Sequence, residues 1–141
     1  MSERPPLYAV DANVILRHLL GDDAGLSAAA GAIFAAVEVG EVRVLCDPVN
    51  LAEVVWVLRS FYKMPNREIG EGLGTLLKAD GFVMPDKGRY IRALECLSEH
   101  DMRFGDACVC ATAVDECGGR LLSFDRKLSS VGGVTRTEAL G

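Results

Sequence analysis

The sequence predicts an α/β fold in which helices cover both faces of a mainly parallel central sheet of four to five strands. Short apolar segments alternate with longer helical patterns along the 141 residues, and this alternation is typical of strand–helix–strand units. Half of the residues are hydrophobic and a quarter are charged, a balance that favours one packed core. We therefore expect a loose tail over residues 1–6 and a single domain over residues 7–141.

The first half of the chain is predicted to contain two strands and four helices. A good cap followed by a first-turn proline marks the start of one helix, at Asp47-Pro48. Asn66 is a candidate cap for the next helix, in which three glycines weaken the helical pattern. The strands are expected at Leu7–Val10 and Val42–Cys46, and the helices directly after the first strand, over Leu26–Val39, from Pro48 to Tyr62 and from Asn66 to Ala79.

The second half continues the alternation with three strands and two longer helices. Asp86 is expected to cap one helix, and Gly118-Gly119 to end the other. The strands are expected at Gly81–Met84, Leu121–Phe124 and Val134–Arg136, and the helices from Asp86 to Glu99 and over Gly105–Cys117. Functional sites in such sheets form beyond the carboxyl ends of the strands.

Composition narrows the possible functions. The longest apolar runs, such as Leu26–Val37, are too short to cross a bilayer, and Met1–Pro6 lacks a secretion signal, so a cytoplasmic protein is expected. Five cysteines occur without a paired metal-ligand spacing: Cys108 and Cys110 come closest, but two positions apart on a helix they point to different faces. The cysteines are therefore expected to be small core residues. The net charge of −5 argues against a broadly basic surface, although a local basic rim can still bind phosphate.

Three acidic residues stand where strands end or a helix begins. Asp11 directly follows the first strand, Asp125 follows the fourth, and Asp106 opens a helix of small and apolar residues. Asp11 and Asp125 are equally suited to capping the helices that follow them, and Asp106 to stabilising the dipole of its own helix. The alternative is that they meet at one edge of the sheet.

Glu53 is the only charged residue between Val49 and Leu58. Trp56 and Val57 make its side of the helix apolar as well, so we expect its carboxylate to be partly buried or beside a pocket. An ion pair with an arginine from elsewhere is the alternative explanation.

Four converging carboxylates indicate metal chemistry. They would repel one another unless cations intervene, and oxygen-only ligands suit Mg²⁺ or Mn²⁺. His18 and His100 are isolated, which argues against zinc, and Ser27, Ser123 and Cys46 lack an activating base. Carboxylate-bound metals lower the pKa of bound water and neutralise charge on a phosphate, so phosphodiester hydrolysis is the predicted reaction. Arg126 and Lys127, directly after Asp125, are predicted to hold phosphates at the pocket rim.

In order and spacing these motifs resemble the PIN-domain family, and within it the VapC-type (virulence-associated-protein) toxin ribonucleases. The resemblance covers nearly the whole chain and is carried by Val10–Arg17, by Glu53 ahead of Val54–Leu58, by Phe104-Gly105-Asp106-Ala107 and by Leu122-Ser123-Phe124-Asp125.

The resemblance implies a three-layer α/β/α sandwich and a Mg²⁺ or Mn²⁺ pocket lined by Asp11, Glu53, Asp106 and Asp125, with Asn13 and Ser123 orienting ligands or water. It also implies hydrolysis of RNA, a homodimer, and silencing by a small antitoxin protein. The Phe-Gly pair before Asp106 differs from the alanine often found there.

Three other classes fit the sequence less well. A catalytically silent RNA- or protein-binding module of the same fold usually lacks one of the pocket acids, and here all four are present. A haloacid-dehalogenase-type phosphatase needs a second Asp where Asn13 stands. A response-regulator receiver could use Asp86 as its phosphate acceptor, but lacks a suitably placed lysine.

Overall fold

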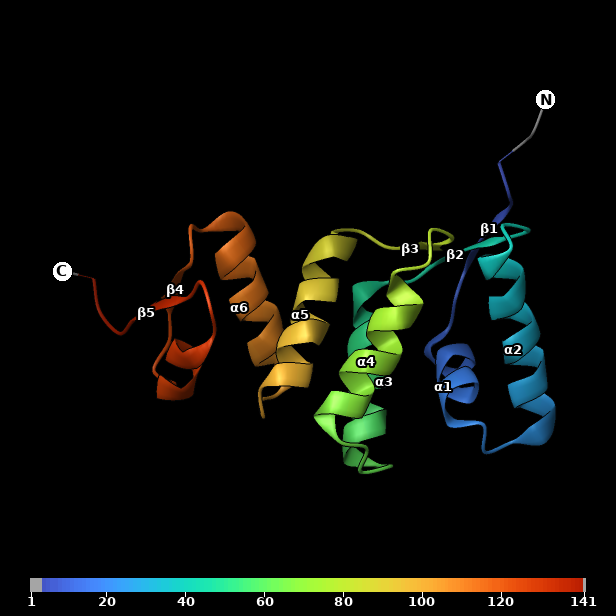
Figure 1. The fold of residues 1–141 in the computed structure, drawn as a ribbon, viewed down its shortest axis with the longest axis horizontal. Helices are drawn as coiled ribbons and strands as arrows, with labels where there is room; N and C mark the ends of the chain where they lie inside the picture. Colours follow the sequence, from blue (N-terminus) through green and yellow to red (C-terminus); the bar gives the residue numbers. More distant parts are fainter. Residues whose placement is uncertain (1–3, 141) are drawn as a thin grey trace.

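The computed structural model describes residues 4–140 and has the predicted α/β character (Figure 1). Six α-helices, one 3₁₀ helix and five short strands follow one another in the described chain. They are β1 (Leu7–Ala9), α1 (Ala12–Leu20), α2 (Ala24–Glu38), β2 (Arg43–Leu45), α3 (Pro48–Ser60), α4 (Asn66–Leu77), β3 (Phe82–Val83), α5 (Lys87–Glu99), α6 (Phe104–Glu116), β4 (Arg120–Leu122), η1 (Arg126–Ser130) and β5 (Thr135–Thr137).

All strand pairs are parallel, but they form two sheets instead of the one that was expected. β2 lies between β1 and β3, with Val44 opposite both Tyr8 and Phe82. β4 pairs only with β5. The two sheets lie at opposite ends of the long axis, with α3, α4, α5 and α6 between them (Figure 1). Strands of two or three residues offer few hydrogen bonds, so helix packing dominates this arrangement.

The core is correspondingly divided. One cluster of buried side chains joins α1–α5 with β2, β3 and Val10, the residue after β1, and includes Ile15, Leu51 and Phe82. A smaller cluster joins α5, α6, β4 and η1 and includes Ala107, Leu121 and Leu128. α5 contributes to both clusters and packs against α4 and α6, so it connects the two halves of the molecule.

The predicted helix ends are partly confirmed. The Asp47 carboxylate accepts a hydrogen bond from the Val49 N–H at 2.9 Å, with Pro48 in the first turn. Asn66 does not cap α4, because Pro65 occupies the cap position and the Asn66 amide donates to the Met102 carbonyl at 2.8 Å. Asp86 precedes α5 in the left-handed conformation without a capping hydrogen bond, and its carboxylate lies 3.7 Å from Arg89 instead. Gly118 and Gly119 end α6 with positive φ, as expected.

Part of the predicted N-terminal tail, residues 1–3, lies outside the described residues. Within the rest of it, the carbonyls of Pro5 and Pro6 accept hydrogen bonds from the side chain and backbone of Arg43.

In the described chain, no single helix has the length and apolar character needed to span a membrane. α1 and α2 reach that length only together, as a pair bent by 107°.

Candidate functional site

Asp106 and Asp125 line one cavity, which we call the charged cavity. Its volume is about 590 Å³, and its walls come from the end of α5, the start of α6 and η1. Both carboxylates also act on the Cys110 thiol: burial raises the pKa of Cys110, and the charges of Asp106 and Asp125 raise it further. The structure therefore brings two of the four predicted acids together.

Backbone geometry fixes the position of each of these acids. Asp106 lies in the first turn of α6, half-buried, and is not the cap residue, a position that Arg103 holds. Asp125 caps η1, and its carboxylate accepts a hydrogen bond from the Lys127 N–H at 3.0 Å. The capping explanation for Asp125 is thus correct, and Asp125 also lines the same cavity as Asp106.

Basic side chains surround the two acids. Arg59, Arg103, Arg126 and Lys127 all line the charged cavity, together with His100 and a third acid, Asp101. Arg103, Arg126 and Lys127 form none of the ion pairs found in the described part of the chain. Cationic groups without a carboxylate partner are suited to holding phosphates, which agrees with the role predicted for Arg126 and Lys127.

Ser123 supports this site from the strand side. Its hydroxyl accepts a hydrogen bond from the Asp125 N–H at 3.0 Å, and its carbonyl accepts one from the Arg136 guanidinium at 2.9 Å. These bonds set the direction of the chain leaving β4 and so position Asp125. Asn13, the other predicted supporting residue, lies exposed in α1, outside the residues that line the charged cavity.

Asp11 lies in a different part of the molecule. It takes the cap position of α1 with an extended backbone, but its side chain makes no capping hydrogen bond. Instead it lines a mainly apolar groove beside β1, together with Tyr8, Val10 and residues of α2. The capping explanation therefore does not account for Asp11.

Glu53 is exposed on α3, so of the two expectations partial burial was wrong. Its chain neighbour Ala52 lines a cavity, but Glu53 itself is not among the residues that line it. The side of α3 on which it stands is uncovered, because Val49 is 76% and Trp56 66% exposed. Trp56 and Val57 led to the expectation of burial, but Trp56 is exposed and only Val57 packs against the core. An ion pair does not account for Glu53 either, since it belongs to none of the pairs found in the described residues.

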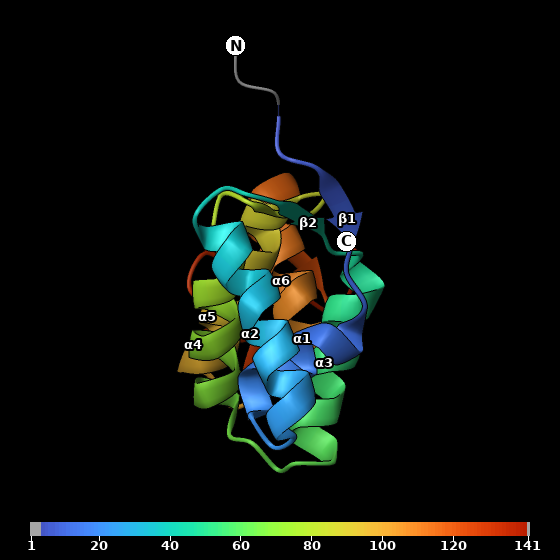
Figure 2. The ribbon, with the colours of Figure 1, turned by 90° about the vertical axis from the view of Figure 1, so that its right-hand side faces the viewer.

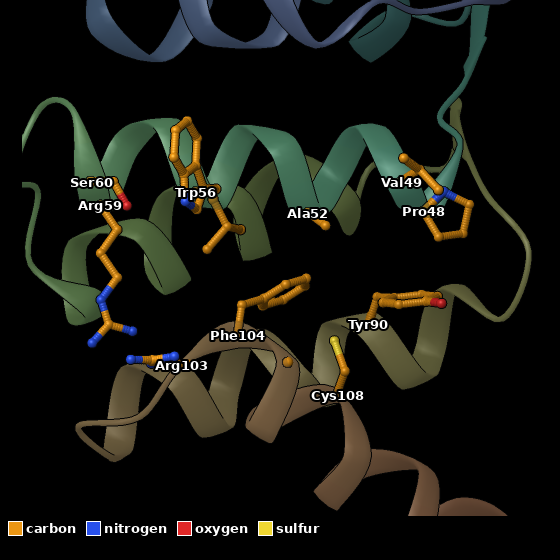
Figure 3. A pocket seen from close by; sticks show the side chains of 12 residues that line it. Pro48, Val49, Ala52, Trp56, Arg59, Ser60, Tyr90, Arg103, Phe104 and Cys108 are labelled. Atoms are coloured by element: carbon orange, nitrogen blue, oxygen red, sulfur yellow. The ribbon is translucent and has the colours of Figure 1, made fainter.

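A second, apolar cavity adjoins the charged cavity, with a volume of about 880 Å³ (Figure 3). Pro48, Val49 and Ala52 of α3 lie across it from Tyr90, Phe104 and Cys108 of α5 and α6. Arg59 and Arg103 lie at one end and line both cavities.

Sequence reasoning missed the part played by these two arginines. The sequence predicts no role for Arg59, yet its guanidinium donates a hydrogen bond to the Met102 carbonyl at 2.7 Å. The two residues are 43 positions apart, and no local pattern links them.

The metal expected for this chemistry does not fit the side chains as they are arranged. Among the described residues, no three His, Cys, Asp or Glu side chains come close enough to hold a metal ion. The charged cavity supplies Asp106 and Asp125, whereas Asp11 and Glu53 remain apart from it. The metal-ligand roles of the four acids therefore stay predictions.

Comparison with known proteins identifies the family. No curated protein matches the chain. The profile of the PIN domain matches residues 8–134, which is most of the sequence and contains all four acids. The chain therefore belongs to the PIN-domain family.

Proposed function

We propose that the protein is a metal-dependent endoribonuclease that hydrolyses RNA phosphodiester bonds, and that it is a VapC-type toxin acting in the cytoplasm. PIN domains are commonly nucleases, and they generally use divalent metal ions. The observation that carries the proposal is the charged cavity, which Asp106 and Asp125 line together with Arg126 and Lys127. Membership of the family and this combination of charges support the same chemistry.

The residues of the charged cavity divide the work on a phosphodiester. Arg126 and Lys127 would bind the phosphates that flank the bond, and Arg103 the next phosphate along the strand. Asp106 and Asp125 would offer oxygen ligands for Mg²⁺ or Mn²⁺, the ions that such ligands suit. In the described part of the chain, too few such ligands come together to hold a metal ion.

We further propose a small antitoxin protein as a partner. The apolar cavity opens beside the charged cavity, and Arg59 and Arg103 line both. A peptide segment with hydrophobic side chains followed by acidic ones would fill the first and neutralise the arginines of the second. The antitoxin would then block the site used by RNA.

The test is cleavage of a structured RNA by the purified protein with Mn²⁺ or Mg²⁺, beside EDTA. Asp106→Asn should reduce cleavage by at least 100-fold, since it removes a negative oxygen while keeping the size of the side chain. Glu38→Gln is the matched control, because Glu38 is exposed at the end of α2 and lies outside the charged cavity. It should leave cleavage unchanged.

Metal-dependent cleavage that Asp106→Asn abolishes would establish the reaction. Equal activity of Asp106→Asn and Glu38→Gln would remove Asp106 from the site. A well-folded wild-type protein that binds RNA but cleaves none of a broad RNA panel would identify the silent binding module instead.

A further inference from the structure

The apolar cavity between α3 and the pair α5 and α6 has the size and lining of a ligand site. Its volume of about 880 Å³ lies within the range of roughly 300–1,000 Å³ that is typical of sites for small organic ligands. Val49 and Ala52 of α3 form one wall, and the rings of Tyr90 and Phe104 extend toward them from α5 and α6 (Figure 3). The lining is therefore mainly apolar, with aromatic rings on one wall.

One end of this cavity is positively charged. Arg59 and Arg103 both reach that end (Figure 3), and the described residues that line the cavity include no carboxylate. The Arg59 guanidinium is held in place by its hydrogen bond to the Met102 carbonyl. The Asp101 carboxylate lies 3.9 Å from Arg59 but is fully exposed, so water screens this pair. An anionic group is therefore favoured beside the two arginines.

A ligand that complements both parts of the cavity carries an anion next to a flat apolar ring. A nucleotide has this form, because its phosphate binds the planar donors of arginine and its base stacks on aromatic side chains. A peptide with acidic and apolar side chains would complement the arginines as well. The rings of Tyr90 and Phe104 favour the nucleotide, since stacking needs a flat face on both partners.

The cavity is within reach of an RNA strand. Arg59 and Arg103 also line the charged cavity, where Arg126 and Lys127 are proposed to bind phosphates. Figure 2 shows α3 along one outer side of the molecule, with α4 on the opposite side, and the exposure of Trp56 shows that the outer side of α3 is open. A strand held in the charged cavity can therefore place a neighbouring nucleotide in the apolar one.

We propose that the apolar cavity is a base-binding subsite, in which an unpaired nucleotide of the RNA substrate stacks its base on Tyr90 and Phe104 while its phosphate binds Arg59 and Arg103. The proposal rests on the proposed nuclease function for the identity of the substrate. A base inside a double helix is already paired and stacked, so the subsite selects unpaired segments. Because the lining offers few polar groups that could distinguish the edges of the bases, it selects these segments with little preference for sequence. The proposed antitoxin would compete with the base for this cavity.

The first test compares two oligomers on the wild-type protein, in EDTA so that metal-dependent cleavage is excluded. One is a short oligouridylate, and the other is an abasic oligomer of the same length, which keeps every phosphate but has no bases. The oligouridylate should bind roughly 5- to 150-fold more tightly, the range expected for one stacked base.

Trp56 provides a direct signal from the cavity, because it is the single tryptophan of the chain and lines this cavity. Its fluorescence should be quenched when the oligouridylate binds and should stay unchanged when the abasic oligomer binds. A base that stacked elsewhere on the protein would leave the fluorescence unchanged with both oligomers.

Phe104→Leu tests the aromatic wall itself, since leucine keeps an apolar side chain but lacks a flat ring. It should lower the affinity for the oligouridylate by about fivefold or more and leave the affinity for the abasic oligomer unchanged. Phe61→Leu is the matched control, because Phe61 is 75% exposed at the end of the same helix α3 that carries Trp56 and lines neither cavity. It should change neither affinity.

Two further measurements separate stacking from charge and from folding. Arg103→Gln should weaken the binding of both oligomers and lower the slope of log K against log salt by about 0.7, whereas Phe104→Leu should leave that slope unchanged. Phe104 also packs against both core clusters, so the melting temperature of its variant is measured first. The comparison of the two oligomers on the wild type does not depend on any variant.

The outcomes distinguish the subsite from the nuclease function. Equal affinity of the wild type for the two oligomers, or binding of neither, overturns the subsite, as does a Phe104→Leu variant that weakens both alike. If the same wild type cleaves a structured RNA with Mn²⁺, the nuclease function stands despite that result. Base-dependent binding by a protein that cleaves no RNA would instead support the subsite and overturn the nuclease function.

Discussion

Replacing Gly70 by alanine should destabilise the protein, because Gly70 of α4 leaves no room for a Cβ atom beside the backbone of α5. A Cβ atom built at Gly70 would lie 2.5 Å from the Leu94 carbonyl oxygen and 3.1 Å from the Ser98 nitrogen. Both are backbone atoms of α5, and the Ser98 hydroxyl donates a hydrogen bond to the Leu94 carbonyl at 3.0 Å. The helices must therefore move apart for the methyl group to fit.

The magnitude follows from two opposing effects. An alanine in the middle of a helix gains about 0.5–1 kcal/mol over glycine, whereas overpacking in a tight core costs about 1–3 kcal/mol. Since the obstruction at Gly70 is backbone, we expect a net loss of about 1–2 kcal/mol in the free energy of unfolding. The loss should spread to both core clusters, because α5 belongs to each of them.

Gly74 provides the matched control in the same helix. It is buried one turn further on, but no atom lies within 4 Å of a Cβ built there. Gly74→Ala should therefore stabilise the protein by about 0.5–1 kcal/mol. Urea unfolding followed by circular dichroism measures both variants. If Gly70→Ala proved as stable as Gly74→Ala, the close approach of α4 to α5 would be refuted.

Two further predictions concern side-chain chemistry. Burial raises the pKa of the thiols of Cys46, Cys96 and Cys108 to about 11, so at pH 8 they should react with a thiol reagent about 100-fold more slowly in folded than in urea-unfolded protein. Equal reaction rates in folded and unfolded protein would show that these thiols are accessible. Because the folded state keeps these protons to a higher pH than the unfolded state does, the free energy of unfolding should fall as pH rises from 9 to 11. Removing Arg126 and Lys127 together by alanine substitution should lower RNA affinity and reduce the slope of log K against log salt by about 1–2. Arg67→Ala, on the exposed face of α4, is the control, and an unchanged slope for the double variant would exclude phosphate contacts there.

Local structure was largely predictable from the sequence, because short-range chemistry determines it. Asp47 followed by Pro48 starts a helix by satisfying an N–H group and fixing φ, whatever the rest of the chain does. Gly118 and Gly119 end α6 for a similarly local reason, since both adopt positive φ. The order of the strands and helices, and hence the α/β class, follows from such signals.

The same local reasoning failed where a distant group competes. Asn66 is a good capping residue, yet its amide binds the Met102 carbonyl, and Arg59 binds the same oxygen. No residue near Asn66 in the sequence indicates that the Met102 carbonyl will accept its hydrogen bond. The prediction that Glu53 is partly buried failed for a different reason. Its apolar neighbours indicate that this side of α3 is covered, but not whether an element of the same chain covers it. Periodicity predicts which face is apolar, and it cannot name the partner.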